Sequence, residues 1–360
     1  MRPRLTFIVP FHKGLGALEQ VLRALTPVAP GDEVIVAADG AVDDCRSLAA
    51  THGTRLVEID GPKGPAVARN AAAASAVGDV LVFVDADVVA SPETVERLAS
   101  VFETRPDVTA VFGSYDESPG SPGFVSTYKN LAHAFVHRDA AGHAETFWTG
   151  FGAVRRTAFH AVGGFDKRFE RPSIEDIDLG YRLSERGHVI LLDPTLTVCH
   201  LKHWTLWGMI KSDVFDRGIP WTQLILRYRR FGGGLNARGS YRLAVVLAYL
   251  AVATAVLTVF DGTFGAPLLF FLVALIYLGA DYYRFFWQKR GAWFAIRVIP
   301  LHFLYHLYNG VSFGVGAILF FLVRYFAVRP AGALLAHALD PQEGAAALIT
   351  SSASFGPRDV

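Results

Sequence analysis

The sequence has few cysteines, little net charge and no long apolar run at its start, and each absence excludes a class of protein. Cys45 and Cys199 are the only cysteines in 360 residues, so a disulfide framework is excluded and a reducing compartment is expected. The formal net charge of +1 implies no nucleic-acid partner. Pro10 interrupts the first apolar run, which is too short for the core of a signal peptide. We therefore expect the N-terminal domain to stay on the cytoplasmic side.

Hydrophobic residues make up 52% of the chain, and residues 241–330 hold most of the excess. Apolar segments at about 243–260, 264–280 and 298–323 predict three transmembrane helices, because a span needs about 20 apolar residues. The first two read as a helical hairpin. Arginines flank this hairpin on both sides, which predicts that both its ends are cytoplasmic. The third span then leaves a flexible tail, residues 331–360, outside.

Residues 204–240 combine Trp204, Trp207 and Trp221 with apolar and basic residues. This composition is typical of amphipathic helices that lie in the membrane interface. Soluble helices that pack on the preceding domain are the alternative. We expect a multi-pass protein of the cell (inner or plasma) membrane, in contact with membrane lipids.

The N-terminal part alternates short apolar runs with helical segments, which predicts an α/β domain with a mostly parallel sheet. Helices are expected over residues 15–25, 65–77 and 175–185, with Gly78 as a C-cap and Ser91 as the N-cap of a further helix. The predicted strands are residues 5–9, 33–38, 55–59, 80–84 and 108–112.

Polar or turn residues follow three of the predicted strands. Pro10 and Phe11 come after the first, Asp39 after the second, and Asp85 and Asp87 after the fourth. Open parallel sheets bind ligands beyond the carboxyl ends of their strands, so a cleft is expected there. Alternate residues of a strand point the same way, so both carboxylates of the Asp-Ala-Asp triplet can face one divalent cation. The triplet alone is common, and its place at a strand end is what favours a metal site.

These segments resemble the family 2 glycosyltransferases of the GT-A fold, in order and spacing across residues 4–200. The resemblance is carried by Thr-Phe-Ile-Val-Pro-Phe at residues 6–11, the run that ends at Asp39-Gly40, Gly-Pro-Ala-Val-Ala-Arg-Asn at 64–70 and the strand before Asp85. It implies a Rossmann-like catalytic domain and an inverting transfer from a nucleoside-diphosphate sugar. The family's tandem acid pair before glycine is Ala-Asp in this chain, which leaves the donor base less defined.

The resemblance also implies roles on the donor side, where Pro10 and Phe11 lie. Asp39 contacts the base, Asp85 the ribose or nucleotide, and Arg69 the phosphates or the base. Asp87 binds Mn²⁺ or Mg²⁺. A turn residue at Asp39 and a plain helix-face arginine at position 69 are the alternatives.

On the acceptor side, Phe-Trp-Thr-Gly at residues 147–150 and Glu-Asp at 175–176 resemble the family's acceptor segment and catalytic pair. The resemblance places Trp148, Gly150 and Glu175 near the acceptor. An inverting transfer needs a general base, and Asp176 matches its position. The alternative is an N-cap pair of Ser173 with Asp176. A helix N-terminus should lower the pKa of such a base.

His200 ends an apolar run and is a candidate metal ligand or phosphate contact, with His203 and Trp204 next to it on the acceptor side. Either histidine is as readily a solvated or core residue. The Gln-x-x-Arg-Trp motif of processive synthases is absent at this place, where His-x-x-His-Trp stands instead.

The sequence therefore predicts a catalytic domain over residues 1–203, with a nucleotide-sugar half (1–115) and an acceptor half (116–203). Interfacial helices (204–240) and the membrane region (241–330) follow. The predicted reaction is a single, metal-dependent sugar addition to a lipid-linked or other membrane-proximal glycan acceptor. A nucleotidyltransferase, a processive synthase and a non-catalytic scaffold or lipid-binding protein that kept the GT-A fold are the alternatives.

Overall fold

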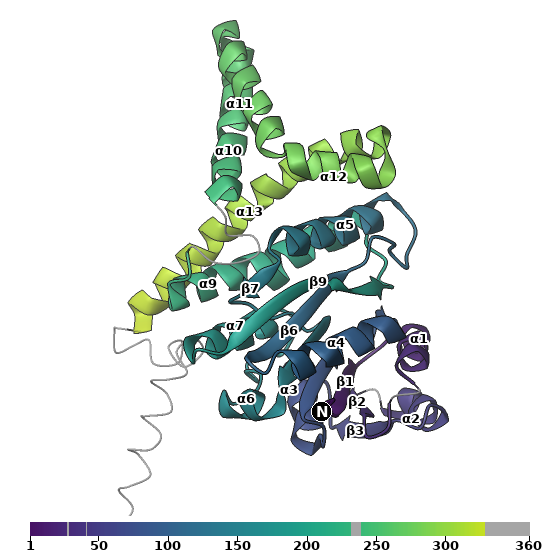
Figure 1. Ribbon diagram of the computed structural model, residues 1–360. Coiled ribbons are helices and arrows are strands. Elements are labelled where there is room, and N and C mark those ends of the chain that lie inside the picture. The colour runs from purple at the N-terminus through teal and green to yellow at the C-terminus, as the bar shows by residue number, and fades with distance from the viewer. Residues whose placement is uncertain (27–28, 41, 232–238, 328–360) are drawn as a thin grey trace, which may run out of the picture.

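The structure is a computed structural model that describes residues 1–26, 29–40, 42–231 and 239–327. The described part holds one large sheet flanked by helices, and a group of C-terminal helices that stands on one side of it (Figure 1). The predicted flexible tail, residues 331–360, lies outside the described residues.

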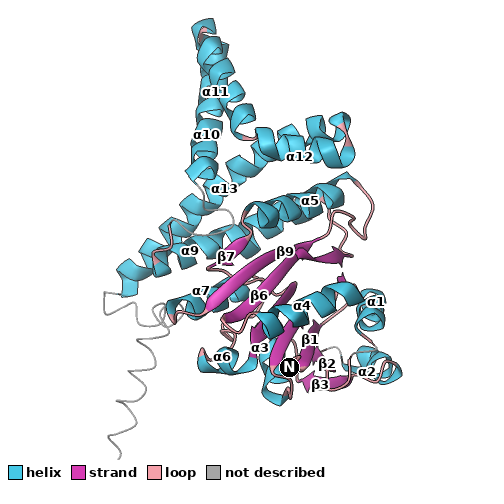
Figure 2. Cartoon of the chain, in the orientation of Figure 1, coloured by secondary structure: helices cyan, strands magenta, loops and turns pink. Residues whose placement is uncertain are grey.

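Nine strands form the sheet in the described part of the chain. They are β1 (Leu5–Phe11), β2 (Glu33–Asp39), β3 (Arg55–Ile59), β4 (Val80–Val84), β5 (Val88–Ala90), β6 (Val108–Tyr115), β7 (Gly142–Ala144), β8 (Phe151–Arg155) and β9 (Val189–His200). Their order is β3-β2-β1-β4-β8-β6-β9-β5, and β7 pairs with β9 (Figure 2). The first four run parallel, whereas β8 is antiparallel to both of its neighbours. The predicted α/β sheet is confirmed, and its second half is mixed.

Burial explains why the parallel strands are continuous apolar runs. Every residue of β4 is buried, as expected for a strand with both faces covered. In the parallel register Phe11 lies opposite Ala38, and Ile8 lies opposite Phe83. The carboxyl ends of β1, β2 and β4 therefore meet at one edge of the sheet.

Seven helices lie within this α/β part. They are α1 (Leu15–Leu25), α2 (Val42–Thr51), α3 (Pro65–Ser75), α4 (Pro92–Thr104), α5 (Phe124–Asp139), α6 (Arg156–Ala161) and α7 (Glu175–Glu185). The predicted N-cap of α4 is confirmed, because the Ser91 side chain accepts a hydrogen bond from the Thr94 N–H. The predicted C-cap at Gly78 is wrong: α3 ends at Ser75 and Ala76 is its C-cap. Gly78 instead packs so closely on Thr6 that an added Cβ would lie 2.6 Å from the threonine hydroxyl.

An unbroken helical run leads away from the sheet. It consists of α8 (Leu206–Lys211), the π-helix η1 (Ser212–Gly218) and α9 (Ile219–Tyr228). One face of this run packs on the α/β part, where the Trp221 indole N–H donates to the Tyr181 hydroxyl at 3.1 Å. Trp207 is 70% exposed on another face. The run thus has both a face packed on the domain and an exposed aromatic face.

The C-terminal helices are α10 (Gly239–Phe260), the 3₁₀ turn η2 (Gly262–Phe264), α11 (Gly265–Leu278), α12 (Ala280–Arg290) and α13 (Ala292–Ala327). In Figure 1, α10 and α11 lie side by side and project away from the sheet, whereas α12 and α13 lie along the α/β part. The predicted hairpin is therefore present as a helix pair. Exposed apolar side chains cover α10, α11 and the second half of α13.

Two described helices, α10 and α13, are long and apolar enough to cross a membrane. The pair α11 and α12 makes a third candidate if it counts as one span, although the two helices are bent by 60° at Gly279. The predicted third span, residues 298–323, lies inside α13, which continues through Pro300. The side of the membrane on which each end lies stays a prediction.

Candidate active site

The donor-side residues meet at the edge where β1, β2 and β4 end. Pro10 and Phe11 close β1, next to the end of β2 at Asp39. Phe11 is 2% exposed and belongs to the hydrophobic core, so its ring is part of the floor of this edge. The His12 ring nitrogen Nδ1 lies 2.9 Å from the Asp39 carbonyl oxygen, which ties the two strand ends together.

Asp39 is buried and already bonded on both carboxylate oxygens. Its Oδ1 accepts from the Lys63 N–H at 2.7 Å, and its Oδ2 accepts from the Gly64 N–H at 2.8 Å. Gly64 is the N-cap residue of α3, the helix that carries Arg69. Asp39 therefore fixes the start of α3. This arrangement favours the alternative in which Asp39 is a turn residue, because neither carboxylate oxygen is left without a bond for the nucleotide base.

Arg69 lies at the centre of an ion triad with Glu175, which is buried, and Asp85, which is partly exposed. It donates to Asp85 Oδ1 at 2.7 Å and to Glu175 Oε1 at 2.8 Å, and its side chain is 4% exposed. The other Glu175 oxygen, Oε2, accepts from the Ser173 N–H. The Glu175 carboxylate thus points into the protein, where it holds Arg69 and the backbone of Ser173. Its predicted contact with the acceptor stays a prediction. The triad joins α3, the end of β4 and the start of α7.

Replacement of Arg69 by methionine is expected to destabilise the fold strongly. Breaking a buried ion pair leaves charges uncompensated and costs about 3–5 kcal/mol, and here two carboxylates, Asp85 and Glu175, would lose their partner. Arg23→Met is the matched control, because Arg23 pairs with Glu19 on the surface, where such a pair contributes about 0–1 kcal/mol. Thermal unfolding of both variants in one detergent measures the difference, and equal midpoints would contradict the assigned role.

Asp87 directly precedes β5 and faces His200 at the end of β9, the strand that pairs with β5. Its Oδ2 lies 3.6 Å from the His200 Nε2, and the Leu201 N–H donates to the Asp87 carbonyl at 2.8 Å. Burial raises the pKa of the Asp87 carboxyl, but His200 and Lys202 outweigh it and the net pKa is below the ordinary value. Asp87 is therefore an ionised carboxylate beside an imidazole at neutral pH.

Asp87 and His200 fit a divalent cation that takes its remaining ligands from a bound substrate. No group of three or more His, Cys, Asp or Glu side chains in the described ranges is arranged to hold a metal by itself. Mg²⁺ typically keeps one or two protein carboxylates and takes its remaining ligands from phosphates and water. Asp87 with His200 supplies such a partial set, whereas Asp85 is engaged by Arg69. His203 lies elsewhere, with its Nδ1 3.0 Å from the Ser121 hydroxyl.

An aromatic cluster behind His200 was not anticipated from the sequence. The Tyr115 ring stacks on the His200 ring at 4.3 Å with an interplanar angle of 5°. Trp148 meets Tyr115 edge-on and also contacts His133. Burial lowers the pKa of His133 well below its usual range and raises that of Tyr115, so both stay neutral. The cluster fixes the plane of the His200 ring, and the only hint of it in the sequence is the i, i+4 spacing of His133 and His137 on α5.

Asp176 sits at the start of α7 and is held by its neighbours. Its Oδ2 accepts from the Thr149 N–H at 3.2 Å and from the Thr149 hydroxyl at 3.3 Å, and its Oδ1 accepts from the Ile177 N–H. The capping alternative is wrong, because Ile174 is the N-cap residue and the Ser173 hydroxyl donates to the Asp216 carbonyl. Ser173 and Asp176 therefore form no capping pair, although Asp176 Oδ1 bonds to the first-turn N–H of Ile177.

The expected effect of the helix N-terminus on the pKa of Asp176 is also wrong. Burial, together with the negative charge of Glu175, raises the pKa of Asp176 to about 7. Arg69 and Arg217 lower it, but they do not outweigh burial. The carboxyl thus titrates near neutral pH, which is where a general base is most effective.

Transfer activity is expected to rise with pH through an apparent pKa near 7. Asp176 accepts a proton only when ionised, and its pKa of about 7 means that it becomes protonated as the pH falls through neutrality. An unshifted carboxyl, with its ordinary pKa of 3.8, would stay active far below that point. A kcat/KM profile between about pH 5 and 9 measures this, and a flat profile would rule out the assignment.

Two of the remaining acceptor-side residues, Trp148 and Gly150, belong to the segment before β8. Gly150 accepts a hydrogen bond from the Asp85 N–H through its carbonyl, and a Cβ at Gly150 would lie 2.1 Å from the Trp148 ring. Trp148 is 8% exposed, so little more than an edge of its ring is accessible to an acceptor. Trp204 is 9% exposed, and the Lys202 ammonium lies 4.2 Å from the centre of its ring.

The π-helix η1 adds residues that the sequence did not single out. The Asp213 carboxylate accepts from Lys129 of α5 and, at 2.8 Å, from the Tyr308 hydroxyl of α13. Arg217 is exposed, and no described residue gives it a hydrogen bond or ion pair. Its positive charge reaches Asp176 and contributes to the pKa of that carboxyl. π-Helical turns often occur at functional sites.

The sheet and the acidic residues at its edge define a class of protein with an α/β nucleotide-binding architecture. Residues 6–163 match the family model for Glycosyl transferase family 2. These residues include the motifs at 6–11 and 64–70 that carry the resemblance to this family.

Individual relatives are distant. The chain is 28% identical over 222 residues to validoxylamine A glucosyltransferase of Streptomyces hygroscopicus subsp. limoneus, which covers 51% of this chain and 49% of that one. It is also 28% identical over 222 residues to pre-mycofactocin glycosyltransferase of Mycobacterium tuberculosis (strain CDC 1551 / Oshkosh), which covers 59% and 46%. The chain spans about half the length of the relatives it matches. A mannosyltransferase structure from Pyrobaculum calidifontis, in complex with GDP-Man and Mn²⁺, aligns with a TM-score of 0.46 at 19% identity over 88% of this chain and 85% of that one.

Proposed function

We propose that the chain is an inverting glycosyltransferase that moves one sugar from a nucleoside-diphosphate sugar to a lipid-linked or membrane-proximal acceptor. The observation that carries this proposal is the arrangement of three side chains. Asp87 and His200 lie 3.6 Å apart at the sheet edge, and Asp176 is held by Thr149 in the segment that leads into the neighbouring strand β8.

The donor is proposed to lie over the ends of β1, β2 and β4. Pro10 and the backbone near Asp39 would border its base, and Asp85 would contact the ribose or nucleotide. Arg69 would act through Asp85 by holding its carboxylate. Asp87 and His200 would bind Mn²⁺ or Mg²⁺, which when bound neutralises charge on the diphosphate leaving group.

Asp176 is proposed to be the general base. Its carboxylate accepts the proton of the acceptor hydroxyl, the hydroxyl oxygen attacks the anomeric carbon, and the bond from that carbon to the phosphate oxygen breaks. The nucleoside diphosphate leaves with the bonding electrons. One base and an attack from the opposite face of the sugar imply inversion at the anomeric carbon. The backbone and hydroxyl of Thr149 orient the carboxylate for this step.

The acceptor is proposed to approach from the side of η1 and the C-terminal helices. Arg217, Lys202 and His203 are exposed, the charge of Arg217 reaches Asp176, and η1 bonds through Asp213 to α13. The apolar surfaces of α10, α11 and α13 support membrane association, with the catalytic part on the cytoplasmic side. An acceptor that resides in the membrane would then reach Asp176 without leaving the membrane.

The test is turnover with UDP-, GDP- and dTDP-sugars in the presence of Mn²⁺ or Mg²⁺. We expect metal-dependent release of one nucleoside diphosphate, and NMR of the product should show an inverted anomeric configuration. Absence of turnover with every donor would favour a scaffold or lipid-binding protein that kept the fold. Long polymer products would favour a processive synthase.

A further inference from the structure

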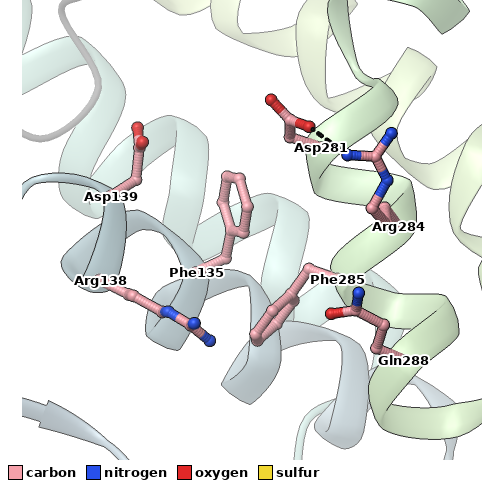
Figure 3. Close-up of a pocket in the computed structure, with 7 residues that line it drawn as sticks. All are labelled: Phe135, Arg138, Asp139, Asp281, Arg284, Phe285 and Gln288. Atoms are coloured by element: carbon pink, nitrogen blue, oxygen red, sulfur yellow. Dashed lines mark hydrogen bonds and ion pairs between the residues drawn. The ribbon is translucent and has the colours of Figure 1, made fainter.

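A pocket of about 310 Å³ lies outside the proposed active site, where α5 meets α12. None of the residues in its wall belongs to the donor, acceptor or metal groups described above. Figure 3 shows the side chains of α5 on one side and those of α12 on the other, with the two phenyl rings between them. The wall consists of Phe135, Arg138 and Asp139 from α5 and Asp281, Arg284, Phe285 and Gln288 from α12.

The pocket combines two guanidinium groups with two carboxylates, so its formal charge is zero. Arg284 pairs with Asp281 at 3.3 Å, and both side chains are well exposed, at 68% and 86%. Such exposed pairs contribute little to stability, so either side chain can take another partner. Arg138 is exposed, and the described chain gives it no hydrogen bond or ion pair. Guanidinium groups bind phosphate in bidentate fashion, and carboxylates bind an ammonium.

The pocket also lies where the apolar helix pair changes into a charged helix. Phe270, Val273 and Tyr277 of α11 are 66%, 57% and 79% exposed, and Asp281 follows one turn later, after the 60° bend. Trp287, in the next part of α12, is 62% exposed, which suits a side chain at the membrane interface. With α10 and α11 inserted in a bilayer, the pocket would lie at the level of the lipid headgroups.

We propose that this pocket binds the headgroup of a phospholipid that carries a primary ammonium, such as phosphatidylethanolamine. Arg138 and Arg284 bind the phosphate, and Asp281 and Asp139 bind the ammonium. Phe135 and Phe285 contact the apolar part of the lipid nearest the headgroup. This proposal rests on the membrane association proposed above.

Native mass spectrometry of the full chain in detergent tests the proposal. The protein is mixed with equal amounts of phosphatidylethanolamine, phosphatidylcholine and phosphatidylglycerol that share the same acyl chains. We expect phosphatidylethanolamine to be enriched over both others. Equal binding of the three lipids, or preference for the anionic phosphatidylglycerol, would overturn the proposal.

Variants separate the two halves of the headgroup. The double variant Arg138→Ala, Arg284→Ala should lower phosphatidylethanolamine binding about 10-fold or more, because it removes the charge-assisted hydrogen bonds to the phosphate. Asp281→Asn should reduce the preference over phosphatidylcholine, whose quaternary ammonium has no N–H to donate. Lys211→Ala is the control, since Lys211 is an exposed cation on α8, away from the pocket. An unchanged preference in the double variant would refute the assignment.

Two further experiments identify the source of the ligand and show which of the two proposals, the pocket or the membrane association, has failed. Displacement of the lipid by an equimolar amount of soluble glycerophosphoethanolamine would assign the pocket to a soluble phosphodiester and refute the lipid. Flotation with vesicles tests membrane association separately. Failure of the wild type and all variants to float would reject the proposed membrane association, whereas flotation without headgroup preference would reject only the pocket.

Discussion

Replacement of Asp176 by asparagine is expected to lower kcat about 10²–10⁴-fold, the usual contribution of a general base. Asparagine has nearly the same shape, so the acceptor and donor should still bind. The amide cannot take up the proton of the acceptor hydroxyl, and the pH dependence near neutrality should disappear with it. Transfer kinetics with a donor identified in the nucleotide-sugar panel measure both effects.

Asp178→Asn is the matched control for this variant. Asp178 lies two residues later on α7 and is also buried, but it bonds to Arg182 at 2.8 Å and to the Tyr228 hydroxyl at 3.1 Å. Its replacement should lower the unfolding temperature while the folded protein keeps its kcat. If Asp176→Asn transferred sugar at the wild-type rate, the base would have to be another residue.

Replacement of Asp87 by asparagine is expected to lower kcat about 10²–10³-fold, the range found when one electrostatic stabiliser of a developing negative charge is removed. The variant should also need a higher concentration of Mn²⁺ or Mg²⁺ for half-maximal activity. The physical reason is the loss of one negative charge from the proposed metal site, for which Asp87 and His200 are the proposed ligands. A metal titration of donor hydrolysis measures this shift.

Asp107→Asn provides a control for general effects of removing an acid, because Asp107 pairs with Arg105 on the exposed surface. It should leave the metal requirement unchanged. A metal titration of Asp87→Asn that coincides with the wild type would remove Asp87 from the metal site. Isothermal titration with Mn²⁺ and the nucleoside diphosphate gives a second readout that is independent of turnover.

Local patterns predicted much of the fold. The strands at residues 55–59 and 80–84 and the helices at 15–25 and 175–185 occur with the predicted bounds, because apolar periodicity and end signals act over a few residues. The long-range pairings could not be derived in this way. Arg69 and Glu175 are 106 residues apart, and nothing in either segment alone indicates that they form a buried pair.

The connections within the site could not be predicted from the sequence. Asp87 lies beside His200, and Asp176 bonds to Thr149, whereas Asp39 and Glu175 are engaged by backbone or buried partners. The roles proposed for Asp87, His200 and Asp176 stay predictions. The pKa of Asp176 depends on burial, which arises only from the packed structure and reverses the expectation from the helix end. Such effects depend on neighbours from distant segments and carry no local signal.

The bonds of η1 have a consequence for how the chain can be divided. Asp213 joins Lys129 of the catalytic part to Tyr308 of α13, and Asp216 bonds to Ser173, just ahead of the proposed base. A soluble fragment cut at residue 203 would remove the carboxylate partner of Lys129 and would uncover the surface beneath α9. The segment after residue 203 is thus a structural component of the domain that holds the proposed active site, and the smallest active fragment should include the C-terminal helices.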